Sequence, residues 1–287
     1  MGSGTGGDGL YAFLSPVSSE LDYLITNRAF LKDKTDQSNK ITVVMPTYCQ
    51  ARYIKEAVSS ILLQTYRNFE LLIVNDGSTD ETSSLLSKFS DSRIRIIEKR
   101  HTGIGDTLNA GFSEGIGSYE TYLASDNTLY PEALERLANV LNSYPLTDFV
   151  YSDFDLFWED KNKTKKACNQ MDMRWERQKF LNGYFVGIVY LWRRNLRLNA
   201  GPFWEKPCED YEMFLRMSQL GGFQYLKSES LGRHRIHSES LTVQLKNKGE
   251  DWAIECSKAF YRHVLKNPYR QTFKNRIEDR DLTLMCG

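Results

Sequence analysis

Short apolar runs alternate with helical patterns along the chain between Ile41 and Tyr151. Residues 41–45 form a β-branched apolar run, which predicts a buried strand, and apolar residues then recur at helical spacing between Tyr53 and Gln64. Further strands are predicted at residues 69–74, 94–97, 119–124 and 149–151, and further helices after Asp80, around 107–112 and from Pro131. This alternation predicts an α/β fold with a mostly parallel sheet that helices cover on both faces.

The pattern becomes irregular after Asp160. Residues 161–166 are charged and predict a solvated turn. They are followed by a predicted helix at 209–220 that ends at Gly221-Gly222, a strand at 223–226, a polar segment at 233–242 and an amphipathic helix at 252–265. We therefore expect a flexible or helical lead over residues 1–39, one domain over 40–245 and a C-terminal helical extension over 246–287.

Polar residues follow four of the predicted strands. Ligands of parallel sheets bind beyond the carboxyl ends of the strands, so these residues should share one edge, which we call the rim. The rim consists of residues 46–48, 75–78, 125–127 and 152–153. It contains three carboxylates, Asp76, Asp126 and Asp153. A carboxylate and an imidazole together can hold Mg²⁺ or Mn²⁺, and Asp126 and His237 are the candidates for such a site.

Composition narrows the class of protein. The 37 basic and 37 acidic residues give a formal net charge of zero, which argues against a nucleic-acid partner, and 41% hydrophobic residues argue against disorder. The 5 cysteines are scattered and form no CxxC pair, so neither zinc nor a disulfide framework is expected. Because the N-terminus also lacks the pattern of a signal peptide, we expect a cytoplasmic protein.

The apolar segment at residues 183–192 is too short to cross a membrane, since a spanning helix needs about 20 apolar residues. Two interpretations fit it. Lining of the core or of a pocket is favoured, and contact with the inner face of a membrane, helped by Arg193 and Arg194, is the alternative.

Three common enzyme motifs are missing. Gly103-Ile-Gly105 begins like a dinucleotide fingerprint, but Leu108 stands where the third glycine belongs and the segment follows the third strand. The sequence also lacks a P-loop and a GxSxG elbow. These gaps argue against dinucleotide enzymes, P-loop NTPases and Ser-His-Asp hydrolases.

Segments in a fixed order between Ile41 and Thr242 resemble the motifs of one enzyme family. They are Val43-Val-Met-Pro-Thr-Tyr48, Gln64-Thr-Tyr-Arg-Asn-Phe-Glu-Leu-Leu-Ile-Val-Asn-Asp-Gly-Ser-Thr-Asp80, Thr102-Gly-Ile-Gly-Asp-Thr-Leu-Asn-Ala-Gly111, Tyr122-Leu-Ala-Ser-Asp-Asn127, Cys208-Glu-Asp-Tyr-Glu-Met-Phe-Leu-Arg216 and Arg235-Ile-His237 with Ser240 and Thr242. In this order and spacing they resemble family 2 glycosyltransferases. The resemblance implies the Rossmann-like GT-A fold, with a nucleotide-sugar-binding half over 40–155 and an acceptor and catalytic half over 156–245.

The resemblance also implies a donor site for a nucleotide-diphosphate sugar, with UDP as the expected nucleotide. In such a site Asp76 would accept a hydrogen bond from a pyrimidine N–H, while Asp126 and His237 would hold Mn²⁺ or Mg²⁺ at the diphosphate. The residues that would contact the donor are Pro46, Thr47, Tyr48, Asp76, Gly103, Asn109, Ser125, Asp126 and Arg235.

The catalytic base implied by the resemblance is Asp210, with Glu209 as the second candidate. A base opposite the leaving group would make the transfer a single inverting displacement onto a hydroxyl of a glycan or glycolipid. By family analogy, the product would belong to a cell-envelope polysaccharide pathway.

Two alternatives remain at this point. The family's DxD position here reads Ala124-Ser125-Asp126, so one of the usual carboxylates is missing, as expected of a sugar-nucleotide-binding module that has lost catalysis. The Glu209-Asp210 pair argues against that module. A sugar-1-phosphate nucleotidyltransferase would need a glycine-rich basic loop after the first strand, and residues 47–52 are not one.

Overall fold

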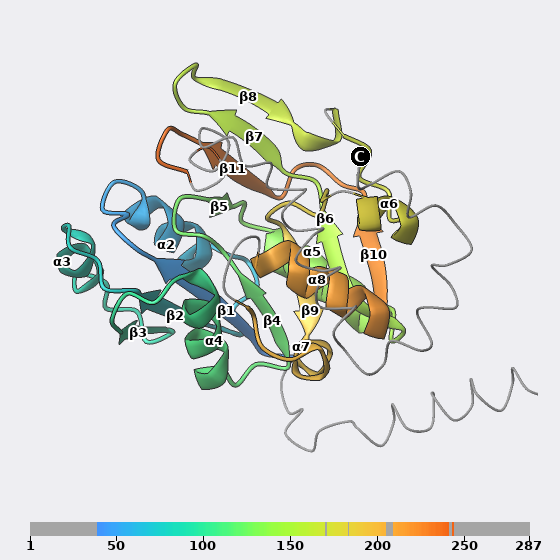
Figure 1. Cartoon of the computed structure of the whole chain (residues 1–287), viewed down its shortest axis with the longest axis horizontal. Helices are drawn as coiled ribbons and strands as arrows, with labels where there is room; N and C mark the ends of the chain where they lie inside the picture. Colours follow the sequence, from blue (N-terminus) through green and yellow to red (C-terminus); the bar gives the residue numbers. More distant parts are fainter. Residues whose placement is uncertain (1–38, 170, 183, 205–208, 241–242, 244–287) are drawn as a thin grey trace, which may run out of the picture. The chain divides into compact units, whose positions relative to one another are not determined.

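The computed structural model describes residues 39–169, 171–182, 184–204, 209–240 and 243 (Figure 1). These residues belong to one unit that begins at Asn39. The predicted lead up to residue 38, the extension 246–287 and the predicted helix 252–265 all lie outside the described residues. The domain boundaries therefore stay predictions.

A seven-stranded sheet forms the centre of the fold, with its strands in the order β10-β6-β9-β4-β1-β2-β3. Neighbouring strands are parallel except at β9, which runs antiparallel to both β4 and β6. The strands are β1 (Ile41–Thr47), β2 (Phe69–Asn75), β3 (Ile94–Glu98), β4 (Tyr119–Tyr122), β6 (Thr147–Ser152), β9 (Tyr190–Arg193) and β10 (Gly222–Leu226). The predicted mostly parallel sheet is confirmed.

Helices pack against this sheet (Figure 1). Every residue of β1 and β2 is buried, as expected for parallel strands covered on both faces. α4 packs against β1 and β2, and α5 packs against β6 and β9. The helices are α2 (Ile54–Leu62), α3 (Thr82–Leu86), α4 (Ile104–Glu114), α5 (Ala133–Ser143), α6 (Arg177–Asn182), α7 (Arg194–Ala200) and α8 (Glu209–Leu220), with a 3-10 turn η1 (Ala167–Asn169). The predicted bounds of α8 are confirmed.

A second sheet of four strands, in the order β5-β11-β7-β8, begins where β4 and β6 end. Its strands are β5 (Thr128–Leu129), β7 (Asp155–Trp158), β8 (Lys163–Lys166) and β11 (Gly232–Ile236). The four strands lie together at the top of the view in Figure 1. This small sheet places β11, which leads to His237, beside the segment that follows β4.

One prediction for the second half of the chain was wrong in part, and one strand was left unassigned. The charged segment 161–166 is only partly a turn, because Lys163–Lys166 pair with β7 as an exposed edge strand. Lysines on an edge strand hinder pairing with another chain, so the charge pattern suits that position. The polar segment 233–242 likewise contains most of β11, which is held by pairing with β5 and β7 rather than by its own apolar pattern.

The apolar segment at residues 183–192 belongs to the core, as favoured from the sequence. Val186, Val189, Leu191 and Trp192 are fully buried, and the segment leads into β9. Within the described ranges, no helix combines the length and the apolar composition needed to cross a membrane.

A buried ion pair joins the two halves of the main sheet. Glu120 on β4 is completely buried, and its carboxylate accepts hydrogen bonds from Arg197 Nε at 2.6 Å and from a terminal nitrogen of Arg197 at 2.9 Å. The indole N–H of Trp192 on β9 donates to the same carboxylate at 3.1 Å. The pair therefore ties β4 to β9 and to α7.

Arg197→Met should lower the free energy of unfolding by about 3–5 kcal/mol, because the Glu120 carboxylate would remain buried without its partner. The double variant Glu120→Gln/Arg197→Met should recover part of this loss, since no charge is then unpaired and Trp192 keeps an acceptor. Urea denaturation measures the free energy of unfolding of both variants. The control is Arg174→Met at the exposed pair with Asp172, which should change stability by no more than about 1 kcal/mol. Equal losses in the single and double variants would contradict this account.

Candidate active site

The carboxyl ends of β1, β2, β3 and β4 lie along one edge of the main sheet because these strands are parallel. Pro46 and Thr47 close β1 and are buried, whereas the Tyr48 side chain that follows is 43% exposed. Ser125, directly before Asp126, is also buried. Asp153 follows β6, and its carboxylate accepts a hydrogen bond from the Tyr225 hydroxyl at 2.6 Å.

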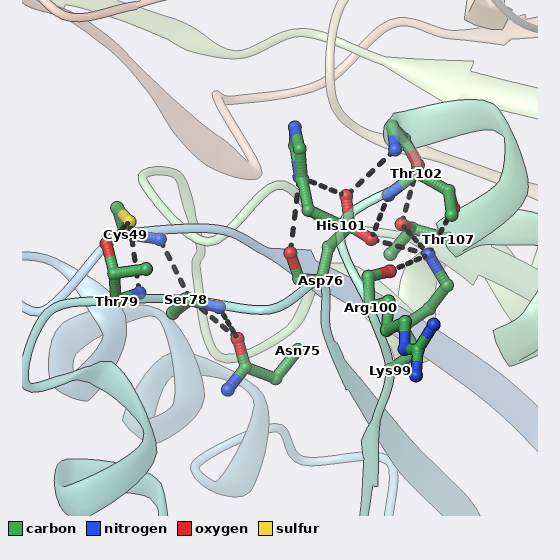
Figure 2. A network of polar contacts seen from close by, with 11 residues as sticks. Cys49, Asn75, Asp76, Ser78, Thr79, Lys99, Arg100, His101, Thr102 and Thr107 are labelled. Atoms are coloured by element: carbon green, nitrogen blue, oxygen red, sulfur yellow. Dashed lines mark hydrogen bonds and ion pairs between the residues drawn. The ribbon is translucent and has the colours of Figure 1, made fainter.

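The Asp76 carboxylate accepts several hydrogen bonds from residues that follow β3 (Figure 2). One carboxylate oxygen accepts hydrogen bonds from Lys99 Nζ at 2.5 Å and from the Thr102 N–H at 3.0 Å. The other accepts the Gly103 N–H at 3.0 Å and lies 2.9 Å from His101 Nδ1. Burial alone would raise the pKa of this carboxyl, but the bonds from Lys99, Thr102 and Gly103 outweigh it and hold the pKa below its usual value. Asp76 thus stays ionised and anchors residues 99–103.

The His101 ring, which lies beside this carboxylate, is stacked on a second aromatic ring. The rings of Tyr48 and His101 are stacked, with centroids 4.1 Å apart and planes 24° from parallel. Gly77 allows the approach of the two loops: its φ is +72°, and a Cβ there would lie 2.9 Å from the His101 backbone nitrogen. The stacked pair and Asp76 together form one end of the rim.

Asp126 and His237 meet, although they are far apart in the sequence. His237 Nε2 lies 3.2 Å from an Asp126 carboxylate oxygen. The other oxygen of Asp126 is buried and makes no hydrogen bond to the described residues. Within those residues no cluster of three or more His, Cys, Asp or Glu could hold a metal. The pair therefore fits a metal only if a ligand such as a diphosphate completes the coordination.

The Arg235 side chain hydrogen-bonds to the segment that carries Asp126 and is paired within the protein. Its Nε donates to the Asp126 carbonyl at 3.1 Å, and its terminal nitrogens pair with Glu56 at 2.5 Å and Glu159 at 3.3 Å. Its backbone N–H donates to the Asn127 side chain at 2.9 Å. The guanidinium charge is thus already compensated by two carboxylates, and a contact with a donor stays a prediction.

The Asn109 side chain is also hydrogen-bonded within the protein. Its amide donates to the Phe203 carbonyl at 2.7 Å and accepts the Phe203 N–H at 2.8 Å. Phe203 stacks on Phe112, with centroids 5.6 Å apart. Asn109 therefore holds the backbone of Phe203, and its contact with a donor stays a prediction.

Asp210, in the first turn of α8, lines a cavity of about 210 Å³. The walls are mostly apolar: Phe154, Leu156, Met171, Tyr184, Phe185, Gly187, Ile188, Asp210 and His234. Tyr184 and Tyr122 lie beside the Asp210 carboxylate and favour its charged form. The Tyr184 hydroxyl donates to the Gly187 carbonyl at 2.7 Å. Glu209 is buried and does not line this cavity. Of the two predicted acids, Asp210 is the one with access to a bound molecule.

The acidic pair has an unusual electrostatic environment. Burial raises the pKa of Glu209, and the charge of Asp210 raises it further. Burial also raises the pKa of Asp210, although hydrogen bonds from the Tyr211 N–H, Tyr184 and Tyr122 offset part of the effect. A carboxylate whose pKa is raised takes up a proton more readily, which is what a general base requires.

Sequence reasoning missed several residues of the site. Lys99 and His101 follow β3, and the end of that strand could have been added to the rim by the same rule that selected the others. Tyr122 and Tyr184, by contrast, reach Asp210 only through the folded chain. His234 lines the cavity, and burial lowers its pKa.

Comparison with known proteins agrees with this architecture. Residues 42–202 match the family model described as Glycosyl transferase family 2. A protein of Rickettsia prowazekii (strain Madrid E), named an uncharacterized glycosyltransferase, is 30% identical over 222 residues, which cover 74% of this chain and 69% of that protein. The matched region includes the rim and reaches β9 and α7.

Two solved structures resemble the fold. Residues 1–349 of Staphylococcus aureus TarS in complex with UDP-GlcNAc superpose with a TM-score of 0.60 and 15% identity, over 83% of this chain and 76% of that chain. The mannosyltransferase PcManGT from Pyrobaculum calidifontis, in complex with GDP-Man and Mn²⁺, gives a TM-score of 0.61 and 17% identity, over 88% of this chain and 73% of that chain. The fold is therefore GT-A.

The raised pKa of Glu209 predicts how stability depends on pH. A carboxyl that binds its proton more tightly in the folded state stabilises the fold fully below the ordinary carboxyl pKa, and this contribution is lost as pH rises through the raised pKa. The free energy of unfolding should thus fall between about pH 5 and pH 8, and Glu209→Gln should reduce this slope. Urea denaturation at several pH values measures it, with Glu132→Gln at an exposed acid as control. Parallel slopes in all three proteins would rule out the effect.

Proposed function

Because the chain belongs to glycosyl transferase family 2, we propose that it transfers a sugar from a UDP-linked donor to a hydroxyl of a glycan or glycolipid, with inversion at the anomeric carbon. The observation that carries this proposal is the position of Asp210, a half-buried carboxylate that lines a cavity and whose pKa is raised. A cell-envelope glycan is the proposed setting.

The donor is proposed to bind along the rim. Tyr48 offers a ring face to a nucleobase, and Asp76 offers an ionised carboxylate at its edge. Pro46, Thr47, Gly103 and Ser125 supply the surrounding backbone and small side chains. The UDP-GlcNAc and GDP-Man complexes of TarS and PcManGT support a nucleotide-sugar donor for this fold.

Asp126 and His237 are proposed to hold Mn²⁺ or Mg²⁺ at the diphosphate of the donor. Carboxylate and imidazole ligands suit such a cation, and the second Asp126 oxygen has no hydrogen bond to the described residues. When bound, the cation would supply positive charge to the leaving diphosphate. Arg235 contributes by fixing the backbone carbonyl of Asp126, so that the carboxylate keeps its place beside His237.

Asp210 is proposed to act as the general base. Its carboxylate would accept the proton of an acceptor hydroxyl while the hydroxyl oxygen forms a bond to the anomeric carbon. The bond between that carbon and the diphosphate oxygen breaks, and its electron pair leaves with UDP. One displacement of this kind inverts the configuration. Tyr184 and Tyr122, whose pKa values burial raises well above the usual range, remain neutral beside the Asp210 carboxylate.

The aromatic walls of the cavity support a sugar-bearing acceptor. Tyr184 and Phe185 line the cavity together with Asp210, and aromatic side chains supply apolar surface for the apolar side of a sugar ring. Acceptors of this class therefore fit better than small polar alcohols.

Asp210→Asn should lower kcat at least about a hundredfold, because the amide keeps the shape of the carboxylate but cannot take a proton. Donor affinity and melting temperature should change little. Release of UDP from UDP-sugars in the presence of glycan acceptors measures turnover, and calorimetry with UDP measures affinity.

The control for Asp210→Asn is Glu135→Gln, a first-turn acid of α5 far from this cavity in the sequence, which should keep full turnover. Wild-type turnover in Asp210→Asn would instead assign the base to another residue, with Glu209 tested next. Donor binding without UDP release by the wild-type protein would identify a binding module that lacks catalysis.

Removal of divalent cations should reduce turnover, and Mn²⁺ or Mg²⁺ should restore it. Asp126→Ala and His237→Ala should each weaken Mn²⁺ binding in the presence of UDP, as measured by electron paramagnetic resonance, and should lower turnover as well. Asp160→Asn, at an exposed acid, serves as the control. Full turnover of the wild-type protein in excess chelator would show that the site works without a cation.

A further inference from the structure

The imidazole of His101 lies where the rim is best suited to hold a planar heterocycle. One face of the ring is stacked on Tyr48, at a centroid distance of 4.1 Å. At its edge, Nδ1 lies 2.9 Å from an Asp76 carboxylate oxygen and 3.2 Å from the Asp76 carbonyl oxygen. Both neighbours of Nδ1 are acceptors, so Nδ1 carries a proton and donates.

These contacts are the ones that a nucleobase would use. A base offers a flat ring to an aromatic side chain and an edge N–H to a carboxylate, which is what His101 offers to Tyr48 and Asp76. The two rings are too close for another ring to enter between them, since stacked rings need about 3.5 Å on each side, or about 7 Å in total. A base can therefore reach Tyr48 only after the imidazole has moved.

We infer that the His101 side chain is an internal occupant of the nucleobase site, which the base of an incoming nucleotide displaces. The inference rests on the proposed function, because it assumes that the rim binds a nucleotide. It adds a residue that sets the affinity of the proposed donor site.

The loop is built so that the side chain can leave while the backbone stays. Lys99 Nζ and the N–H groups of Thr102 and Gly103 hold the loop to Asp76, and Lys99 also bonds to Thr102 Oγ1 at 2.5 Å (Figure 2). None of these bonds involves the His101 ring. The ring itself is 53% exposed, so rotation about its side-chain bonds moves it into solvent.

Displacement has a cost that the nucleotide must offset. The apparent affinity of a site that is open only part of the time is reduced by the open fraction. Because displacement breaks one stacking contact and one hydrogen bond, the apparent nucleotide affinity should be reduced about tenfold. A variant without the imidazole should therefore bind the nucleotide more tightly.

Calorimetric titration of the full-length protein with UDP and with GDP tests the inference. His101→Ala should bind the preferred nucleotide about tenfold more tightly than the wild-type protein. His101→Phe, which keeps the stacking but not the bond to Asp76, should lie between the two. Pyrophosphate, which has no base, should bind all three proteins equally. Arg100→Ala, at the exposed neighbouring residue whose carbonyl accepts from Lys99, is the matched control and should match the wild-type protein.

Proton NMR provides a second measurement. The chain has 4 histidines, so the ring resonance of His101 can be assigned by its loss in His101→Ala. UDP should shift that resonance, because the imidazole leaves the shielding face of Tyr48.

Equal or weaker nucleotide binding by His101→Ala, or an unshifted resonance at saturating UDP, would overturn the inference and leave the proposed function in place. If neither the wild-type protein nor His101→Ala binds UDP or GDP, both the proposed function and the inference fail. Tighter binding confined to His101→Ala and His101→Phe would establish the displacement.

Discussion

The buried ion pair of Glu120 and Arg197 is the interaction on which the arrangement of the site depends. Glu120 lies on β4, the strand that leads to Asp126, and Arg197 lies on α7, directly after β9. The pair thus fixes an antiparallel strand in the middle of a parallel sheet. Because β9 is held there, the chain leaves α7 toward Phe203, which Asn109 binds on the other side, and then reaches α8. Together with the pairing of β9 to β4 and β6, this buried ion pair helps to position the rim relative to the acidic pair.

The sequence predicted those elements whose own residues determine them. β1 and β2 are apolar at nearly every position because helices cover both faces, and α8 has an apolar face and a terminal glycine pair, so pattern alone located them. β11 and β8 carry Arg, His and Lys at most positions and are strands only because β7 lies between them. Pairing between segments far apart in sequence leaves no local pattern, which is why these strands were not predicted.

For the candidate site too, some features follow from local sequence and others only from the tertiary structure. The rule that ligands bind at the carboxyl ends of parallel strands was enough to select Asp76 and Asp126. It could not say which polar residues the protein itself would use: Glu56 and Glu159 pair with Arg235, and Phe203 binds Asn109, while donor contacts of Arg235 and Asn109 stay predictions. Buried polar groups must be hydrogen-bonded, and the partner is decided by the tertiary structure. The resemblance ranked Asp210 above Glu209, and the fold adds that Asp210 lines the cavity whereas Glu209 does not.

Two aspartates of this site have opposite electrostatic environments, and the difference follows from their hydrogen bonds. Asp76 and Asp210 are both penalised by burial. Asp76 faces a lysine and two backbone N–H groups, which stabilise its charge, and its pKa is lowered. Asp210 lies beside neutral tyrosines and the Tyr211 N–H, which stabilise its charge by less than burial destabilises it, and its pKa is raised. A permanently ionised carboxylate suits recognition, whereas a carboxylate that readily takes a proton suits chemistry. Environments that separate the pKa values of similar groups in this way support the proposal that the rim binds the donor and that Asp210 accepts a proton in the cavity.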